Sequence, residues 1–473
     1  MQLTKTDFIQ YLNCPKSLWA LKREPDTYPH GEFSVFLQKL TREGYEVERY
    51  VRQYFDAIDE RAVDFQRVFE TDTGLFARAD AFETTEDGET ILYEVKSSTS
   101  VKTDADHNHI KDACFQKICA ERSGEKIDRV FLVHLNGGYV RDGDIDPEGL
   151  LEFADVTEDV GAILEDTEAE IDRALALLTE TEINRDGCSC LHNSRAHHCD
   201  TFSIFNPGIP QPSIYSLPRL SAKKRYDFVV NRLFDLSAVP DDYPLSEIQQ
   251  TVVIAAKAGE PQINLAAIQD FLSEMVFPLY FFDYETFSSA VPFLDRTSPH
   301  KHFPVQYSLH ILDADGQLTH REFLEREPRL PDRLIEQMES DIGLVGSIVS
   351  WHASFEKARN RDMALLFPEK AEFLTGLNDR MVDLEDVFKA DYVDARFDGS
   401  TSIKKVLPVI CPELSYKELD VQDGASAMEA WQRMIDADKA LAGEIAEALL
   451  NYCKLDTLAM VEIYRFLRQL VHR

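Results

Sequence analysis

Residues 278–287 read PLYFFDYETF, an apolar run that carries Asp283 and Glu285 two positions apart. Alternate side chains of a β-strand point to the same face, so the run predicts a strand that presents both carboxylates together. Unpaired charges are costly to bury, and a bound divalent cation would offset that cost. The stretch therefore predicts a metal site on a buried strand.

The residues that follow this run predict the rest of an α/β domain over residues 273–473. Two more strand-like stretches, 305–313 and 317–324, come next and are expected to pair with the first in antiparallel fashion. Helical and strand patterns then alternate, and the domain finishes with a long helical stretch. This order of elements is typical of a mixed sheet covered by helices.

Two acidic residues farther along the chain could complete the metal site. Glu356 lies where a predicted strand runs into a helix, and Asp456 lies on a late helix four residues after Tyr452, on the same helix face. With the strand pair, these carboxylates could hold two Mg²⁺ ions about 4 Å apart, one activating water and the other stabilising the leaving oxygen. Tyr452 would position the attacking water. For each carboxylate taken alone, a solvated surface charge is the alternative interpretation.

This ordered set resembles the DnaQ-like exonucleases of the DEDD class, in the variant that carries a tyrosine in the last motif. The resemblance implies a ribonuclease H-like sheet and the removal of nucleotides from 3′ ends. One position departs from the pattern, because the second motif of that class usually ends in aspartate and this chain has Glu356. A domain that binds nucleic acid without cleaving it is therefore an alternative.

A second acidic group lies in residues 1–205. Asp80 falls in one strand-like stretch, Glu94 and Lys96 fall in the next, and the turn signal EDG separates the two stretches. A hairpin would bring Asp80 beside Glu94 and Lys96, which point to the same face of their strand. Two carboxylates can bind Mg²⁺ or Mn²⁺, and the lysine can orient a water molecule or offset charge in the transition state. A surface strand with alternating charges is the alternative.

The spacing of this group resembles the PD-(D/E)XK nucleases of the RecB type. By that resemblance, Glu48 on a predicted helix corresponds to an upstream metal ligand, and Gln116 corresponds to the glutamine of a following helix motif. That motif usually has a tyrosine four residues later, where this chain has Ala120. The resemblance implies a restriction-endonuclease-like fold that hydrolyses phosphodiester bonds.

Three cysteines, Cys188, Cys190 and Cys199, lie close together in the sequence, and Cys14 precedes a proline near the N-terminus. The set resembles a subgroup of RecB-type nucleases, CRISPR-associated ones among them. In that subgroup, one cysteine before the nuclease core and three after it hold a 4Fe–4S cluster. Zn²⁺ is the alternative, because three histidines within residues 192–198 lie among the cysteines and mixed Cys/His sets suit tetrahedral Zn²⁺.

Residues 206–272 are predicted to connect the two halves. The segment opens with NPGIPQPSIYSLPRL, whose prolines break regular structure, and continues into a short basic helix. A second basic pair follows the stretch GSTS in the later half, where a helix could bind phosphate at its N-terminus or be an ordinary capped helix. The candidate nucleic-acid contacts are Lys223, Lys224 and Arg225 on the connector helix, and Lys404 and Lys405 after GSTS.

The composition is that of a globular protein, with 44 % hydrophobic and 28 % charged residues. The net charge of the 473 residues is −34, so the surface as a whole repels polyanions and contact with nucleic acid must be local. The run from Met275 to Phe282 is too short to span a membrane, and the first residues lack a secretory pattern. We therefore expect a cytoplasmic protein without membrane contact. Its remaining cysteines, Cys453 among them, are expected to be small buried residues.

The motifs together resemble a bacterial family that joins a RecB-type nuclease half to a DnaQ-like half, and the resemblance covers almost the whole chain. It implies a metal-dependent nuclease that acts on DNA in repair, recombination or defence. RNA processing is one alternative, and nucleic-acid binding with one catalytically inactive head is another. The sequence leaves the oligomeric state open.

Overall fold

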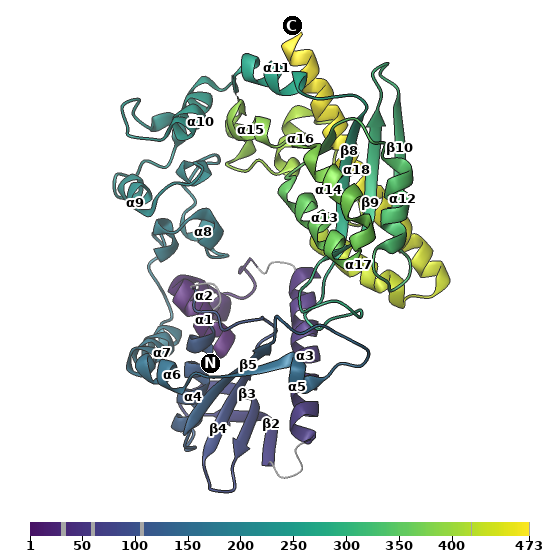
Figure 1. Cartoon of the computed structure of the whole chain (residues 1–473). Helices are drawn as coiled ribbons and strands as arrows, with labels where there is room; N and C mark the ends of the chain where they lie inside the picture. Colours follow the sequence, from purple (N-terminus) through teal and green to yellow (C-terminus); the bar gives the residue numbers. More distant parts are fainter. Residues whose placement is uncertain (30–34, 58–61, 105–107, 418, 473) are drawn as a thin grey trace. The chain divides into compact units, whose positions relative to one another are not determined.

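The computed structural model describes residues 1–29, 35–57, 62–104, 108–417 and 419–472. The chain divides into two compact units (Figure 1). Unit 1 comprises Met1–Gly208 and Ser289–Lys301, and unit 2 comprises Ile209–Ser288 and His302–Arg473.

This division differs from the predicted one in two places. The predicted connector from residue 209 onward folds with unit 2, where its short strand β7 (Gln262–Ile263) pairs with β13 (Tyr392–Val393). Residues 289–301 lie in the later half of the sequence but belong to unit 1. No local sequence motif predicts either assignment, because both depend on contacts between distant parts of the chain.

Unit 1 is built on a six-stranded mixed sheet in the order β1-β3-β4-β5-β6, with β2 pairing with β3. Strands β3 and β4 form the predicted hairpin, and β4 runs parallel to β5. The strands are β1 (Leu3–Thr4), β2 (Ala62–Glu70), β3 (Leu75–Thr84), β4 (Thr90–Val95), β5 (Arg129–Leu135) and β6 (Leu151–Asp155). The helices are α1 (Lys5–Asn13), α2 (Pro15–Arg23), α3 (Val35–Asp56), α4 (His109–Arg122), α5 (Pro147–Leu150), α6 (Thr157–Ala162), α7 (Leu164–Thr179) and α8 (Phe202–Phe205).

Both faces of the unit 1 sheet are covered. On one face, Phe8 of α1 and Phe115 of α4 pack in a core with Leu92 of β4. On the other face, Val47 of α3 packs in a second core with Tyr93 of β4. Since Leu92 and Tyr93 are consecutive, the alternation of the strand decides which core each joins, and Glu94 points to the same face as Leu92, toward α4.

Unit 2 is built on a five-stranded mixed sheet in the order β10-β9-β8-β11-β12. Strands β8, β9 and β10 are antiparallel, as predicted, and β11 is parallel to both β8 and β12. The strands are β8 (Leu279–Phe287), β9 (Phe303–Leu312), β10 (Leu318–Leu324), β11 (Ile348–Ser350) and β12 (Met381–Asp383). The helices are α9 (Ala222–Val230), α10 (Glu247–Ala258), α11 (Leu265–Ser273), α12 (Asp332–Asp341), α13 (Ser354–Leu366), α14 (Ala371–Asp379), α15 (Asp386–Ala390), α16 (Ile403–Ile410), α17 (Gly424–Asp436) and α18 (Lys439–Val471).

Strand β8 has two different faces. Phe282 and Tyr284 join a core with Met338 of α12. The intervening residues face α18, since the rings of Phe281 and Tyr464 lie 5.6 Å apart. Asp283 and Glu285 lie on this second face, so the two carboxylates point toward α18.

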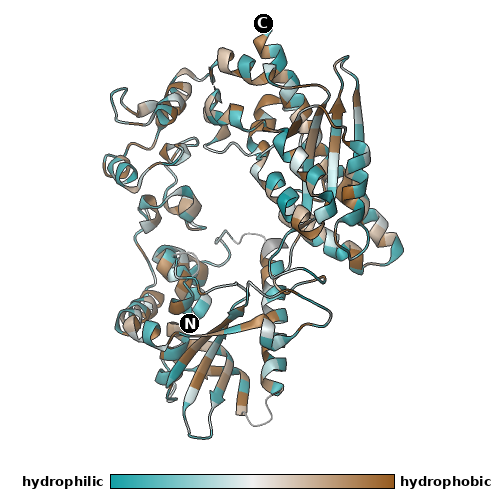
Figure 2. Ribbon diagram, viewed as in Figure 1, coloured by the Kyte–Doolittle hydropathy of each residue, from teal (hydrophilic) through white to brown (hydrophobic). Residues whose placement is uncertain are grey.

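The hydropathy colouring in Figure 2 shows helices of both units with hydrophobic and hydrophilic stretches in alternation, as expected where one side of a helix packs against a sheet. Among the described residues, no helix combines the length and the apolar character needed to cross a membrane. The α/β character predicted for both halves is confirmed.

Candidate functional site

Four buried or half-buried carboxylates line one cavity of about 400 Å³ in unit 2. Strand β8 supplies two of them, the first turn of α13 supplies one, and α18 supplies the fourth. We call this group the four-carboxylate site; it consists of Asp283, Glu285, Glu356 and Asp456.

Three other side chains line or reach the same cavity. Tyr452 lies one helical turn before Asp456 on α18, and the Lys404 Nζ atom lies 5.4 Å from the centroid of the Tyr452 ring. The Tyr416 hydroxyl donates a hydrogen bond of 2.6 Å to Asp456 Oδ1. Lys405, by contrast, is exposed and is not part of the cavity wall.

The electrostatics of the four-carboxylate site are dominated by burial and mutual repulsion. Burial raises the pKa of Asp283 well above its ordinary value, and the negative charges of Asp456 and Glu285 raise it further. Burial likewise raises the pKa of Glu356 to about 8 and that of Asp456 to about 6. Without an added cation, the site therefore holds protons at neutral pH.

In the four-carboxylate site, Glu356 has a buried carboxylate oxygen without a hydrogen-bond partner among the described residues. Its side chain is 2 % exposed, and its Oε2 atom makes no hydrogen bond with any described residue. A buried oxygen without a partner costs free energy, and carboxylate oxygens are the ligands that Mg²⁺ and Mn²⁺ prefer. The donor set thus fits a divalent cation.

A second acidic group lies in unit 1, where β3 and β4 pair. Asp80 Oδ2 accepts a hydrogen bond of 2.8 Å from the backbone N–H of Val95, and Lys96 Nζ lies 2.8 Å from Glu94 Oε1. We call Asp80, Glu94 and Lys96 the hairpin site; they line a cavity of about 530 Å³ together with Glu48.

Glu94 is the most highly connected member of the hairpin site. Lys5 Nζ lies 2.5 Å from its Oε1 atom, and Gln116 Nε2 donates a hydrogen bond to its Oε2 atom. Burial alone would raise the pKa of Glu94, but Lys5 and Lys96 outweigh burial and lower it to about 2. Burial and the charge of Glu94 raise the pKa of Asp80 to about 8. The group therefore contains one ionised carboxylate held between two lysines.

Glu48 completes this cavity from α3. Its Oε2 atom accepts a hydrogen bond of 2.8 Å from Gln66 Nε2, and burial raises its pKa. Lys5 was not singled out in the sequence, since nothing in the pattern of the first residues shows that α1 begins beside β4. Tyr416 was missed for a similar reason, because its position depends on the packing of a loop against α18.

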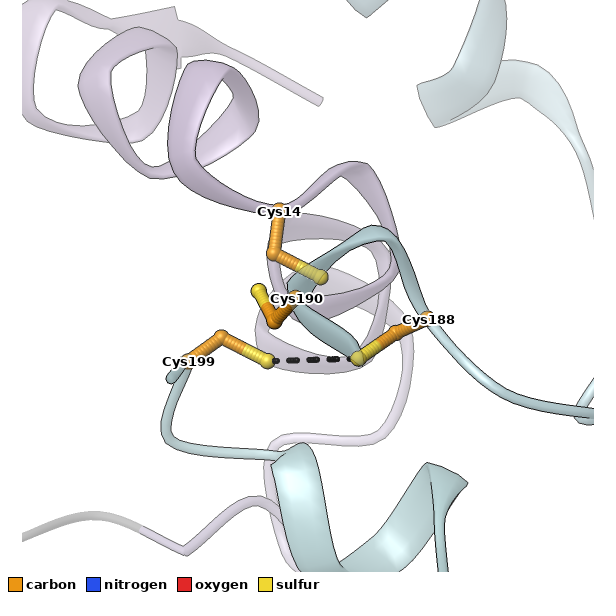
Figure 3. Close-up of side chains that lie close together, drawn as sticks. All are labelled: Cys14, Cys188, Cys190 and Cys199. Atoms are coloured by element: carbon orange, nitrogen blue, oxygen red, sulfur yellow. Dashed lines mark hydrogen bonds between the residues drawn. The ribbon is translucent and has the colours of Figure 1, made fainter. Parts of the chain in front are cut away.

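The four predicted cysteines meet in unit 1, and Figure 3 shows their side chains pointing toward one another. The Sγ atoms of Cys14, Cys188, Cys190 and Cys199 all lie within 4.8 Å of one another, and those of Cys188 and Cys199 lie 3.9 Å apart. No described histidine belongs to this group. A four-sulfur site therefore exists, and it could bind a metal ion or cluster.

The surroundings of Cys188 favour its thiolate form. Contacts with the neighbouring thiols lower the pKa of Cys188 and raise the pKa values of Cys190 and Cys199. Asn206 Nδ2 also donates to Cys188 Sγ over 3.3 Å. Since metals bind the thiolate form of cysteine, this arrangement favours metal binding.

The basic residues of the predicted connector line neither of the two carboxylate cavities. Lys223 on α9 is exposed, and Lys224 lines a third cavity of about 780 Å³ in unit 2. Arg225 donates a hydrogen bond of 3.2 Å to the carbonyl oxygen of Leu220. Of the predicted nucleic-acid contacts, Lys404 alone lines one of the two carboxylate cavities.

Comparison with known proteins relates part of this chain to sequences without an assigned activity. A domain of unknown function, DUF2779, matches residues 280–402, a stretch that includes Asp283, Glu285 and Glu356 but not Asp456. The uncharacterized protein MG366 of Mycoplasma genitalium is 30 % identical over 220 residues, covering 41 % of this chain and 32 % of that protein. The uncharacterized protein UU173 of Ureaplasma parvum is 27 % identical over 249 residues, covering 47 % and 36 % respectively.

The chain thus spans about a third of the length of these curated relatives. No solved structure matches the chain. The chain is therefore similar, over part of its length, to a domain family whose function the family description leaves unassigned.

Proposed function

We propose that this protein is a metal-dependent nuclease that hydrolyses phosphodiester bonds in DNA and has two catalytic heads. The observation that carries the proposal is the four-carboxylate site, where acidic side chains from β8, α13 and α18 surround one cavity. Buried carboxylates that repel one another are costly to the fold, and binding of divalent cations removes that cost. The mixed sheet with three antiparallel strands supports the DnaQ-like interpretation of this head.

In this proposal each side chain of unit 2 has a separate task. Asp283, Glu285, Glu356 and Asp456 would hold Mg²⁺ or Mn²⁺, which supplies an activated water and neutralises charge on the phosphate when bound. Tyr452 lines the same cavity and would orient the attacking water by its hydroxyl. The Lys404 ammonium would attract the phosphate of the 3′-terminal nucleotide.

The hairpin site of unit 1 would be the second head. Asp80, Glu94 and Glu48 offer carboxylate oxygens in one cavity, and the Lys96 ammonium lies beside Glu94, where it would offset negative charge at the reacting phosphate. Gln116 would hold the Glu94 carboxylate in place through its hydrogen bond.

The four-cysteine group would act as a structural clamp within unit 1, because it joins Cys14 to the segment that contains Cys188, Cys190 and Cys199. We propose a 4Fe–4S cluster, and Zn²⁺ is the alternative, since four thiolates suit both. Anaerobically purified protein should be brown with absorbance near ~400 nm and contain iron. A colourless protein that contains zinc would overturn the cluster, and C14S should lose the bound metal in either case.

The activity is tested with 5′- and 3′-labelled DNA, single-stranded and duplex, in Mg²⁺ or Mn²⁺. We expect D283N to reduce 3′-end degradation at least about 100-fold, because it removes a metal ligand, and E94Q to abolish the remaining cleavage. The matched controls are E260Q in unit 2 and E148Q in unit 1, both at exposed glutamates. An absence of cleavage by the wild-type protein, or equal cleavage by D283N/E94Q, would refute the proposal.

A parallel series with labelled RNA measures substrate preference, and faster turnover of RNA would favour RNA processing. One observation favours a further alternative, in which the hairpin site binds nucleic acid without cleaving it. Glu94 already has two lysine partners, so its carboxylate is less available to a metal. Loss of all activity in D283N alone, with DNA binding retained, would support that alternative.

A further inference from the structure

A thiol reaches into the four-carboxylate site from α18. Cys453 is completely buried, and its Sγ atom lies 3.8 Å from Asp283 Oδ2. The sulfur and one carboxylate oxygen each from Asp283 and Glu285 all lie within 4.8 Å of one another. Because Cys453 precedes Asp456 by three residues, both side chains lie on the face of α18 that packs against β8.

The position of this thiol differs from that of an ordinary buried cysteine. Cys411, also buried in unit 2, belongs to no group of possible metal ligands among the described residues. Cys453, in contrast, has its Sγ atom within 4.8 Å of a carboxylate oxygen of Asp283 and of one of Glu285.

An independent observation also points to a ligand at this place. The Oε2 atom of Glu356 is buried in the wall of the same cavity and has no hydrogen-bond partner among the described residues. The site therefore offers hard carboxylate oxygens and one soft sulfur around the same space. Oxygen ligands suit Mg²⁺ and Mn²⁺, whereas thiolate sulfur selects softer ions such as Zn²⁺ and Co²⁺.

We propose that Cys453 is a ligand of the four-carboxylate site when a thiophilic divalent ion occupies it, so that Zn²⁺-like ions compete there with Mg²⁺ and Mn²⁺. The Cys453 Sγ–metal bond forms as the thiol proton leaves to the buffer, and no electrons are transferred. This inference rests on the proposed function only in taking the four-carboxylate site as a metal site.

The experiment is a titration with Co²⁺, whose bond to a thiolate gives a charge-transfer band in the near ultraviolet. The titration uses protein whose four-cysteine group is shown by metal analysis to be filled. Zn²⁺ is added first only where that group is empty, and only in the amount that fills it, because Co²⁺ does not readily displace Zn²⁺ from thiolates. We expect the wild-type protein to show the band, and C453A and C453S to lack it. C411A is the matched control and should keep the band.

The affinities provide a second measurement that does not depend on catalysis. We expect C453A and C453S to bind Co²⁺ about tenfold or more weakly, and to bind Mg²⁺, measured by competition, within about twofold of the wild-type affinity. Co²⁺ binding without the band, or a band that remains in C453A, would overturn the role of Cys453 and leave the metal site intact. Unchanged Mg²⁺ and Co²⁺ binding in D283N would instead refute the metal site and the proposed function with it.

Discussion

Glu94 in unit 1 and Glu285 in unit 2 are both buried glutamates on inner strands, yet their carboxylates have opposite surroundings. Glu94 lies between Lys5 and Lys96, which lower its pKa. Glu285 shares its cavity with three other carboxylates; burial raises its pKa, Asp456 raises it further, and the charge of Lys404 only partly opposes this. One site is charge-balanced by the protein itself, and the other depends on protons or added cations.

The two sites therefore differ in how far the stability of their unit depends on a bound ion. In the hairpin site, Glu94 is paired with Lys5 and Lys96 without any ion, and a metal there must compete with two ammonium groups. The four-carboxylate site destabilises unit 2 until an ion binds, so binding is coupled to a gain in stability. Three measurements test this contrast between the two sites.

The largest expected effect is the loss of a lysine from the hairpin site. In K96M, Glu94 remains buried with one lysine fewer, and we expect the free energy of unfolding to fall by about 3 kcal/mol. The free energy of unfolding is measured by urea denaturation, from the transition in which unit 1 unfolds. K126M removes a lysine of the same unit that is 81 % exposed, and should cost less than about 1 kcal/mol. Equal effects in the two variants would show that Glu94 does not need its lysine.

The next effect is stabilisation by divalent cations. At a Mg²⁺ or Mn²⁺ concentration 100 times the dissociation constant, binding at one site should stabilise the protein by about 2.7 kcal/mol. Thermal unfolding with and without the ion measures this gain. In D283N we expect the ion-free protein to be more stable than the wild type, because a neutral amide replaces a buried carboxyl group that must take up a proton in the folded state. We also expect the increase in stability on adding the ion to become smaller. If the stabilisation by the ion were unchanged in D283N but lost in E94Q, the hairpin site and not the four-carboxylate site would be the one that depends on the ion.

The smallest effect, at most about 1.4 kcal/mol per pH unit for a single group, is the dependence of stability on pH in the absence of divalent ions. The folded protein holds a proton on Glu356 up to about pH 8, whereas the unfolded chain releases it near the ordinary value of 4.5. The contribution of Glu356 to the free energy of unfolding is therefore fully present below about pH 4.5 and is lost as the pH rises toward 8. Glu94 has the opposite sign, because its stabilising charge is lost as the pH falls from 4.5 toward 2.

Urea denaturation in EDTA across this pH range measures both signs. We expect E356Q to reduce the loss of stability on the alkaline side, and E94Q to reduce the loss on the acidic side. A pH profile that E356Q leaves unchanged would show that Glu356 is ionised in the folded protein at neutral pH.

The sequence predicted those parts of the molecule that local patterns determine. The β3–β4 hairpin follows from alternation on both sides of the turn EDG, and β8 follows from an apolar run of the length of one strand. Strand β2 was not predicted, because its residues are mostly exposed or half-buried and show no clear alternation.

The candidate sites divide in the same way. Asp283 with Glu285 and Glu94 with Lys96 are neighbours in the sequence, so strand geometry alone pairs them. Lys5 and Tyr416 reach their carboxylates only through tertiary packing, and no spacing in the sequence encodes that contact. Cys453 was predicted to be a small buried residue, which it is, but burial does not reveal that its sulfur lies beside Asp283.

The segment 289–301 has a consequence for how the chain is made. Ala290 and Val291 belong to the core of unit 1 that also contains Val47, and the backbone N–H of Ala290 donates to Glu43 Oε1 over 3.1 Å. During synthesis, this core cannot close when residue 208 leaves the ribosome; it must wait until β8 has also been translated. Unit 1 therefore completes its core only after the first part of unit 2 has been made, and a fragment that ends at residue 208 would expose apolar core surface and be prone to aggregate.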